Sequence, residues 1–314
     1  MIKEEFYYDS RDGKSKLHAV RYAPDDAENI CCVVQIVHGM AEYFERYEEF
    51  AEFLTSKGCV VTGEDHMGHG KSVGENGKYG YFCEQDPATV VVRDVHRLKK
   101  ITEEQYPQVP YIILGHSMGS FIARNYLCRY GSGIGGAVIV GTGMQSAGLI
   151  FVAKAMAGIQ KLFCGSKHVS HFIDKAAFGG YNKRIDSPRT SSDWLSRNTD
   201  NVDRYIADEL CGFTFTVNGF QTLFELIRRL QKQENLEKVP QNLPILMVSG
   251  AEDPVGDYGK GVHKACESLK RAGVKNITVK LYENDRHELL NEDDAEAAME
   301  DIWQWICKEV PGIA

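Results

Sequence analysis

The chain has 314 residues, of which 43% are hydrophobic and 25% charged, and its formal net charge at pH 7 is -8. An apolar share of this size is ordinary for a soluble globular protein and is enough for a substantial core. The acidic balance argues against a nucleic-acid-binding surface, because no basic excess is available to neutralise phosphates. It also gives no general attraction to anionic membranes.

The nine cysteines lack the spacing of a disulfide framework or of a zinc motif. Several lie in apolar runs, such as the Cys31-Cys32 pair before Val33 and Val34, where a free thiol behaves as a small hydrophobe. We therefore expect reduced cysteines and a reducing compartment.

No membrane or export segment is predicted. The first residues, Met1 to Glu5, have no apolar signal core. The longest apolar stretch, roughly residues 147–159, is interrupted by Lys154 and is shorter than a bilayer span. The expectation is a cytoplasmic chain without a transmembrane segment.

Short apolar runs alternate with helical patterns along most of the chain. Residues 6–8 and 17–20 predict an antiparallel hairpin, since Arg11-Asp12-Gly13 between them is a turn signal. A Gly-rich loop covers residues 66–80. Beyond the hairpin, we expect strands at residues 31–37, 59–63, 111–114, 137–140, 245–248 and 277–281. The expected helices cover residues 42–57, 118–130 and 260–272, one that contains Val91, Val95, Leu98 and Ile101, and a closing one that contains Ala295, Met299, Ile302 and Ile306.

Continuous apolar strands that alternate with helices indicate an α/β protein with a mainly parallel sheet covered on both faces. The alternation stops between residues 143 and 236, where aromatics are scattered and no buried strand is evident. We interpret residues 143–236 as a helical cap inserted into a core made of residues 1–142 and 237–314. The alternative is a separate helical domain.

The strongest local motif is Gly115-His116-Ser117-Met118-Gly119, which matches G-x-S-x-G. It follows a predicted strand and precedes a predicted helix, the setting of a nucleophile elbow, whose sharp turn exposes the serine hydroxyl. Ser117 is therefore the candidate nucleophile, the alternative being an ordinary tight turn.

A serine hydroxyl becomes a good nucleophile when a neighbouring base accepts its proton, and histidine suits this role near neutral pH. His287 is the best placed of the ten histidines, because it follows the strand at residues 277–281 and strand ends converge at one edge of the sheet. We expect His66, His69 and His116 to be structural.

The third member should orient the imidazole and stabilise its charged form. Asp253 follows the strand at residues 245–248, and the order Ser, Asp, His is the one expected after such an elbow. Glu252, Asp257 and Asp285 are rivals on nearby loops. Two backbone N–H groups are the candidate oxyanion donors: that of Met118, after the nucleophile, and that of Met40, after the strand that ends at residue 37.

Five motifs from about residue 38 to 292 occur in an order that is specific to one family. They are His38-Gly39-Met40-Ala41-Glu42 with Arg46-Tyr47, Asp65 to Ser72, the elbow around Ser117, Ser249 to Gly256, and Arg286 to Glu292. The chain resembles the monoacylglycerol lipase and lysophospholipase branch of the α/β-hydrolase superfamily, sometimes labelled serine aminopeptidase in family names.

This resemblance implies an α/β-hydrolase fold with an inserted cap, a Ser117–His287–Asp253 triad, and an oxyanion hole at Met40 and Met118. It implies no metal or organic cofactor. The expected partner is a small-molecule ester, such as a monoacylglycerol or lysophospholipid, with transient contact of the cap with a lipid surface. One departure is Ser120, where many relatives carry a second glycine after the elbow.

The substrate remains open at this stage. Six cap phenylalanines are candidates for an acyl channel, although aromatics in a cap are more often its packing: Phe151, Phe163, Phe172, Phe213, Phe215 and Phe220. A small-ester carboxylesterase and an aminopeptidase or amidase are alternatives. The latter needs a cap carboxylate to hold a substrate ammonium, and the candidates are Asp193, Asp200, Asp203, Asp208 and Glu209. A non-catalytic ligand-binding protein is a remote alternative.

Overall fold

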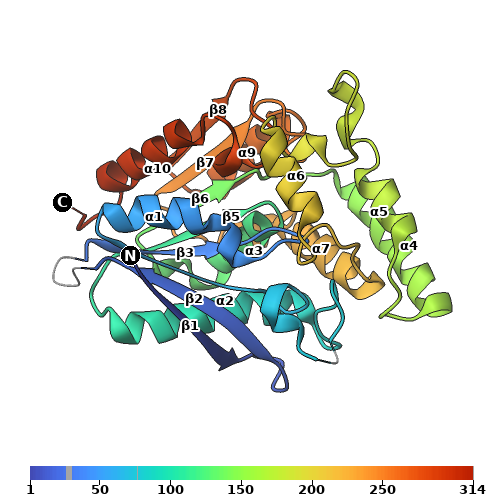
Figure 1. The fold of residues 1–314 in the computed structure, drawn as a ribbon, viewed down its shortest axis with the longest axis horizontal. Helices are drawn as coiled ribbons and strands as arrows, with labels where there is room; N and C mark the ends of the chain where they lie inside the picture. Colours follow the sequence, from blue (N-terminus) through green and yellow to red (C-terminus); the bar gives the residue numbers. More distant parts are fainter. Residues whose placement is uncertain (26–29, 76, 314) are drawn as a thin grey trace.

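An eight-stranded sheet forms the centre of the computed structural model, which describes residues 1–25, 30–75 and 77–313 (Figure 1). The strand order is β1-β2-β4-β3-β5-β6-β7-β8. The hairpin β1–β2 is antiparallel and β2 pairs antiparallel with β4. The remaining pairs, β4–β3, β3–β5, β5–β6, β6–β7 and β7–β8, are parallel. The strands are β1 Ile2–Asp9, β2 Lys16–Ala23, β3 Cys32–Val37, β4 Cys59–Glu64, β5 Tyr111–His116, β6 Gly136–Val140, β7 Ile245–Gly250 and β8 Ile277–Tyr282.

The predicted α/β class, the hairpin and the mainly parallel sheet are confirmed. Every residue of β3, β4, β5, β6 and β7 is buried, which explains why these strands appear in the sequence as continuous apolar runs. Successive residues of a strand point to opposite faces of the sheet and join different core layers. Val34 and Ile36 of β3 join the core beneath α1 and α10, whereas Val33 and Val37 join the core beneath α2, α3 and α9.

The core helices are α1 Glu48–Ser56, α2 Pro87–Gln105, α3 Met118–Tyr130, α9 Lys260–Arg271 and α10 Ala295–Glu309. The single helix predicted at residues 42–57 differs from the structure, where a 3₁₀ turn at Phe44–Tyr47 precedes α1. The reason is local: the Phe44 N–H donates to Asp65 Oδ1, and the Glu42 carboxylate accepts from the Gly39 N–H. These bonds hold the segment as a loop against the sheet.

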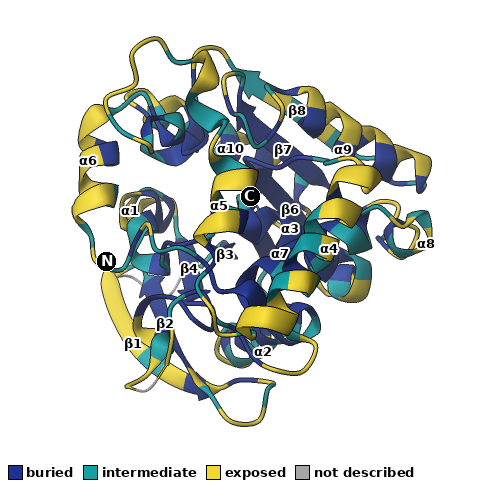
Figure 2. Cartoon of the chain, turned by 90° about the vertical axis from the view of Figure 1, so that its right-hand side faces the viewer, coloured by how far each residue is buried: buried dark blue, intermediate teal, exposed yellow. Residues whose placement is uncertain are grey.

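The segment between β6 and β7 is helical (Figure 2). Its helices are α4 Ala147–Cys164, α5 His171–Phe178, α6 Thr199–Ala207, α7 Val217–Leu230 and α8 Gln233–Leu236, with 3₁₀ turns at Tyr181–Arg184 and Asp193–Leu195. Helix α7 packs against α4 on one side and against the core helices α2 and α3 on the other. The division at residues 142/143 and 236/237 stays a prediction.

Helix α4 is longer than expected. The prediction that the apolar stretch ends near residue 159 is wrong, because the helix continues to Cys164, and its length and composition alone are sufficient to cross a membrane. One face, with Ile150 and Ala157, is buried, and the outer face is exposed. The absence of a transmembrane segment stays a prediction.

The turn between β5 and α3 brings the start of α3 against the end of β3. A Cβ atom on Gly119 would lie 1.9 Å from the Val37 carbonyl oxygen, and one on Gly115 would lie 2.4 Å from the Gly119 oxygen. Neither position can hold a side chain without backbone movement. Ser120 fits beside them, since its hydroxyl donates to the Ser117 carbonyl at 2.6 Å and its oxygen lies 2.8 Å from Thr142 Oγ1, within hydrogen-bond distance.

We therefore predict that Gly119→Ala lowers stability by about 3 kcal/mol, because an added methyl group overpacks a rigid contact. Thermal unfolding followed by circular dichroism should show a midpoint lowered by roughly 5–10 °C. Gly158→Ala is the control: its Cβ meets open space in mid-helix, so this variant should be at least as stable as the wild type. Equal midpoints for wild type and Gly119→Ala would contradict the argument.

Candidate active site

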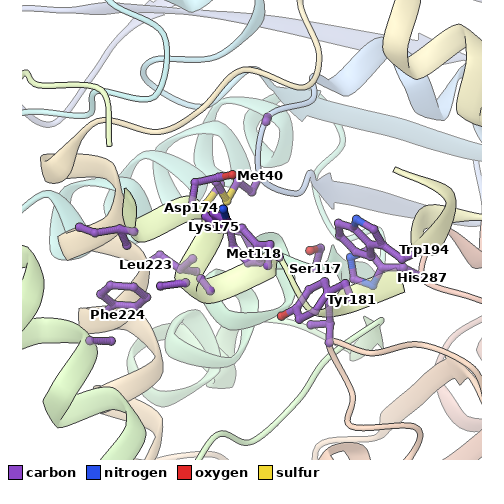
Figure 3. Close-up of a pocket in the computed structure, with 18 of the residues that line it drawn as sticks. Met40, Ser117, Met118, Asp174, Lys175, Tyr181, Trp194, Leu223, Phe224 and His287 are labelled. Carbon is purple, nitrogen blue, oxygen red and sulfur yellow. The ribbon is translucent and has the colours of Figure 1, made fainter. Parts of the chain in front are cut away.

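The candidate residues meet at the carboxyl edge of the parallel strands, where β3 and β5 are neighbours and their following helices, α1 and α3, lie on opposite faces of the sheet. Ser117 sits between β5 and α3 with φ 54° and ψ -121°, a backbone conformation that side-chain-bearing residues rarely adopt. Its amide donates to the Val140 carbonyl of β6 at 3.1 Å, which fixes the turn. The strained turn points the hydroxyl toward the cavity described below (Figure 3).

His287 and Asp253 are in direct contact. His287 Nδ1 lies 3.0 Å from Asp253 Oδ2, and both side chains are buried. The carboxylate is itself held, since Oδ2 accepts from the Ser249 hydroxyl at 3.1 Å and Oδ1 from the Val255 N–H at 2.8 Å. These bonds leave His287 Nε2 as the ring nitrogen available to a reacting group.

His287 and Ser117 line the same cavity, and Figure 3 shows them close together. Among the described residues, the Ser117 hydroxyl makes no hydrogen bond to His287. Such contacts are often loose before substrate binds and tighten in the substrate complex. The rival acids lie elsewhere: Glu252 and Asp257 are exposed, and Asp285 pairs with Arg197 at 2.6 Å.

The two candidate oxyanion donors flank Ser117. Met118 is the first residue of α3, where helical N–H groups have no intrahelical acceptor, and Met40 lines the same cavity. Neither N–H bonds to an acceptor within the described residues. A Cβ atom on Gly39 would lie 3.1 Å from Ser117 Cβ, so the absence of a side chain there lets the Met40 loop approach the nucleophile.

A cavity of about 530 Å³ begins at these residues and extends under the inserted helices. Its lining is mainly apolar, with side chains from α4, α5 and α7 in addition to the core. Leu223 and Phe224 lie at the end away from His287, and Trp194 and Tyr181 lie beside it (Figure 3). The Trp194 ring is 5.1 Å from the His287 ring, centroid to centroid.

The acyl-channel hypothesis for the six cap phenylalanines is wrong for five of them. Of the six, only Phe213 lines the cavity; Phe151, Phe163 and Phe172 are exposed, and Phe215 and Phe220 are buried in the core. The residues of α5 and α7 that do line the cavity were not predicted; they include Ile173, Phe178, Leu223, Phe224 and Ile227. The high amphipathicity of residues 217–230 was the available signal, but it does not reveal what faces the apolar side.

Beneath the site lies a buried polar network centred on His116. His116 Nε2 donates to the His287 carbonyl oxygen at 3.1 Å, and Nδ1 lies 3.2 Å from Glu42 Oε1 and 2.8 Å from the Tyr47 hydroxyl. Glu42 Oε1 also accepts from the Gly39 N–H at 2.5 Å. His116 thus connects the loop that carries Met40 to the loop that carries His287.

Charge stabilises this network. Burial lowers the pKa of His116, but the hydrogen bond and the charge of Glu42 outweigh burial, so the pKa is raised above its ordinary value. Burial raises the pKa of Glu42, yet His116 and Arg46 hold it well below its usual range. Arg46 in turn bonds both oxygens of Glu288 at 2.7 Å, next to His287. The geometry favours a protonated His116.

The histidines His38, His66 and His69 form a separate buried cluster, with ring centroids 4.1 to 6.2 Å apart. Burial lowers the pKa of His38 well below its ordinary value and that of His69 to about 3, so both are neutral. The His38 ring accepts from the His66 N–H at 2.9 Å. The cluster supports the Met40 loop and lies outside the cavity lining, as predicted for His66 and His69.

Comparison with known proteins identifies the family. Residues 28–294 match the sequence profile of a hydrolase family described as serine aminopeptidase, S33. The chain belongs to this family. The chain is similar to the monoglyceride lipase of Mus musculus, with 27% identity over 88% of this chain and 83% of the relative. The monoacylglycerol lipase of Mycolicibacterium smegmatis is 26% identical over 87% of each chain.

Solved structures agree with this S33 family assignment. A thermostable carboxyl esterase from Bacillus coagulans, solved in complex with glycerol, superposes with a TM-score of 0.91 at 30% identity, covering 98% of this chain and 99% of the esterase. A soluble variant of the monoglyceride lipase from Saccharomyces cerevisiae has the same fold, with a TM-score of 0.76 at 20% identity over 99% and 96% of the two chains. The chain is a carboxylic ester hydrolase of the α/β-hydrolase superfamily.

We predict that His116→Gln folds but lowers kcat roughly tenfold to a hundredfold, because glutamine can still donate to the His287 carbonyl but brings no charge to Glu42. The wild-type activity should fall as pH rises through the raised pKa of His116, when the neutral ring places a lone pair against the Glu42 carboxylate. Measuring kcat against pH checks both points. The variant should lack this basic limb, whereas His263→Gln, at an exposed position on α9, should keep it.

An identical basic limb in wild type and His116→Gln would contradict the role given to His116. The pH dependence of the free energy of unfolding tests the role of His116 independently of activity. Since the folded pKa is raised, protonated His116 stabilises the protein at low pH, and this contribution is lost as pH rises through the folded pKa. The difference in unfolding free energy between the wild type and His116→Gln should therefore become smaller as pH rises through the folded pKa of His116.

Proposed function

We propose that the chain hydrolyses single-chain carboxylic esters of the monoacylglycerol or lysophospholipid type through an acyl-enzyme intermediate. Ser117 Oγ attacks the ester carbonyl while His287 Nε2 takes its proton, and the Met40 and Met118 N–H groups donate to the developing oxyanion. His287 then gives the proton to the leaving alcohol. Water, activated by the same imidazole, attacks the acyl-enzyme and releases the acid, which restores the Ser117 hydroxyl.

Asp253 orients His287 in this scheme and stabilises its charged form. The 3.0 Å contact between the two side chains and the full burial of the carboxylate support this assignment. The strained Ser117 backbone supports the nucleophile role, because the fold holds that residue in a conformation unfavourable for an ordinary turn.

The observation that favours a long acyl chain is the cavity. It opens at Ser117 and continues as an apolar space between α4, α5 and α7, with Leu223 and Phe224 at the far end (Figure 3). A mainly apolar cavity of about 530 Å³ offers favourable burial to each methylene group of an acyl chain. Small esters would leave most of this space without ligand contact.

The aminopeptidase alternative receives no support from the acids predicted to hold a substrate ammonium. None of the five lines the cavity: Asp193 bonds Thr190, Asp203 pairs with Arg189, Asp208 accepts from Tyr43, and Asp200 and Glu209 also lie outside the lining. Asp174 does line it, and burial raises the pKa of this carboxyl, but the lining around it is mainly apolar.

Hydrolysis of p-nitrophenyl esters from acetyl to palmitoyl tests the chain-length proposal, with Ser117→Ala as the blank. Because each buried methylene group contributes about 0.8 kcal/mol, kcat/KM should rise roughly three- to fourfold per added carbon and peak at eight carbons or longer. Monoacylglycerols would be tested next. Activity that falls steeply beyond four carbons would contradict the lipid assignment and indicate a small-ester carboxylesterase.

We also propose that the exposed face of α4 and the start of α5, here called the α4 surface, contacts a lipid surface from which substrate enters. Seven large apolar side chains of this surface are more than half exposed: Leu149, Phe151, Val152, Ile159, Leu162, Phe163 and Phe172. Helix α4 has no acidic residue and carries the exposed Lys161 in its last turn, which suits an anionic interface. Its inner face lines the cavity through Ile150, Ala153 and Met156.

The double variant Leu162→Ser/Phe163→Ser should bind several-fold less to vesicles of phosphatidylcholine with phosphatidylserine, because it removes two apolar side chains that are each 84% exposed. Co-sedimentation measures the bound fraction. Ile206→Ser on α6 is the matched control, since Ile206 is also exposed but lies outside the α4 surface. Equal binding by the double variant and the control would contradict the proposal, and hydrolysis of soluble esters should be unchanged in both.

A further inference from the structure

Three cysteine thiols gather at the amino ends of β3 and β4, on the edge of the sheet opposite the candidate active site. Cys32 and Cys59 are the first residues of the two strands and pair directly in the parallel register. Cys31 precedes them, and its N–H donates to the Gly58 carbonyl at 3.0 Å. The backbone that presents the three side chains is therefore fixed by sheet hydrogen bonds.

The spacing of the sulfur atoms matches that of ligands on one metal ion. Cys32 Sγ lies 3.3 Å and Cys31 Sγ 3.7 Å from Cys59 Sγ, and all three sulfurs lie within 4.8 Å of one another. Two thiolates on a tetrahedral zinc, each at about 2.3 Å, are about 3.8 Å apart. Movements of less than roughly an ångström, within the reach of side-chain torsions, would place all three sulfurs on one ion.

The surroundings favour a soft ion. Cys32 and Cys59 have no exposed surface and lie in the core layer beneath α1 and α10, whereas Cys31 is partly exposed. Within the described residues, no histidine or carboxylate joins the group. Thiolate ligands select zinc and similar thiophilic ions over hard cations such as Mg²⁺ or Ca²⁺. The exposed side of Cys31 gives an entry path.

We propose that Cys31, Cys32 and Cys59 form a three-thiolate site for a thiophilic divalent ion of the zinc class, with water as the fourth ligand. Binding replaces three S–H bonds by three metal–sulfur bonds and releases three protons, so affinity falls on acidification. The divalent ion with its three thiolates carries one net negative charge. The coordinated water and the partly exposed Cys31 are on the solvent side of the ion, where water can stabilise this charge. The site is distinct from the ester-hydrolysing machinery, which lies at the other edge of the sheet.

An ion held by these ligands links the start of β3 to the start of β4. Because the three thiols are assembled only in the folded chain, binding stabilises the folded state in proportion to the logarithm of the free ion concentration. Metal addition should therefore raise the thermal midpoint without changing the acyl-chain preference of the enzyme.

The test uses full-length protein, reduced and freed of metal, titrated with Cd²⁺ alone. Thiolate-to-cadmium charge-transfer absorbance in the near ultraviolet should rise and saturate at one ion per chain, and Zn²⁺ should displace the Cd²⁺. Native mass spectrometry should show one bound ion in either case. Cys59→Ser removes the central ligand and should lower the affinity at least a hundredfold.

Cys164→Ser is the matched control, since Cys164 is an exposed thiol at the end of α4, far from Cys31, Cys32 and Cys59. This variant should titrate as the wild type does. Should Cys59→Ser fail to fold, Cys31→Ser at the partly exposed position replaces it, with the same expected loss. No saturable absorbance in the wild type, or equal titration by the ligand variant and the control, would overturn the proposal. A disulfide among the three sulfurs that resists reduction would overturn it as well.

Discussion

The contact between the first turn of α3 and the carboxyl end of β3 is the constraint on which the site depends. It leaves no room for a Cβ atom at Gly119, and it forces Ser117 into a positive-φ conformation. The same contact brings the loop after β3 beside the nucleophile, where Gly39 passes close to Ser117 Cβ. One backbone approach therefore places the candidate nucleophile and both candidate oxyanion donors together.

A buried network of charged side chains also holds the loops of the candidate site together. His116, adjacent to Ser117, connects the Glu42 carboxylate to the carbonyl of His287, and Arg46 joins Glu42 to Glu288. All of these groups are largely buried, so each charge depends on its partner for stability. We interpret this network as holding the His287 loop and the Met40 loop in fixed positions relative to each other.

Much of this arrangement could be predicted from the sequence, because buried parallel strands leave continuous apolar runs and the elbow has a local motif. The helix at residues 118–130 and the strand ends that carry Asp253 and His287 followed from these signals. The position of Asp253 against His287 could be inferred only from chain order, and the structure brings the two into contact. The catalytic roles of these residues rest on the proposed mechanism.

The inserted helices were predicted poorly, and the reason is physical. An apolar residue in an amphipathic helix signals that one face leaves water, but not whether that face meets the core, a substrate cavity or a lipid surface. Phe151, Phe163 and Phe172 were therefore named among the candidates for an acyl channel although they are exposed, whereas Phe224 on α7, which lines the cavity, was not named. The apolar stretch predicted at residues 147–159 was also interrupted by Lys154, whose ammonium pairs with Glu225 of α7, and the helix continues to Cys164.

The assignment of Ser117 as the nucleophile activated by His287 and Asp253 is tested most directly by covalent labelling with a fluorophosphonate followed by peptide mass spectrometry. We predict one label per chain, on Ser117, with labelling abolished in Ser117→Ala and slowed at least a hundredfold in Asp253→Asn. Labelling of a different residue, or undiminished labelling of folded Ser117→Ala, would contradict it.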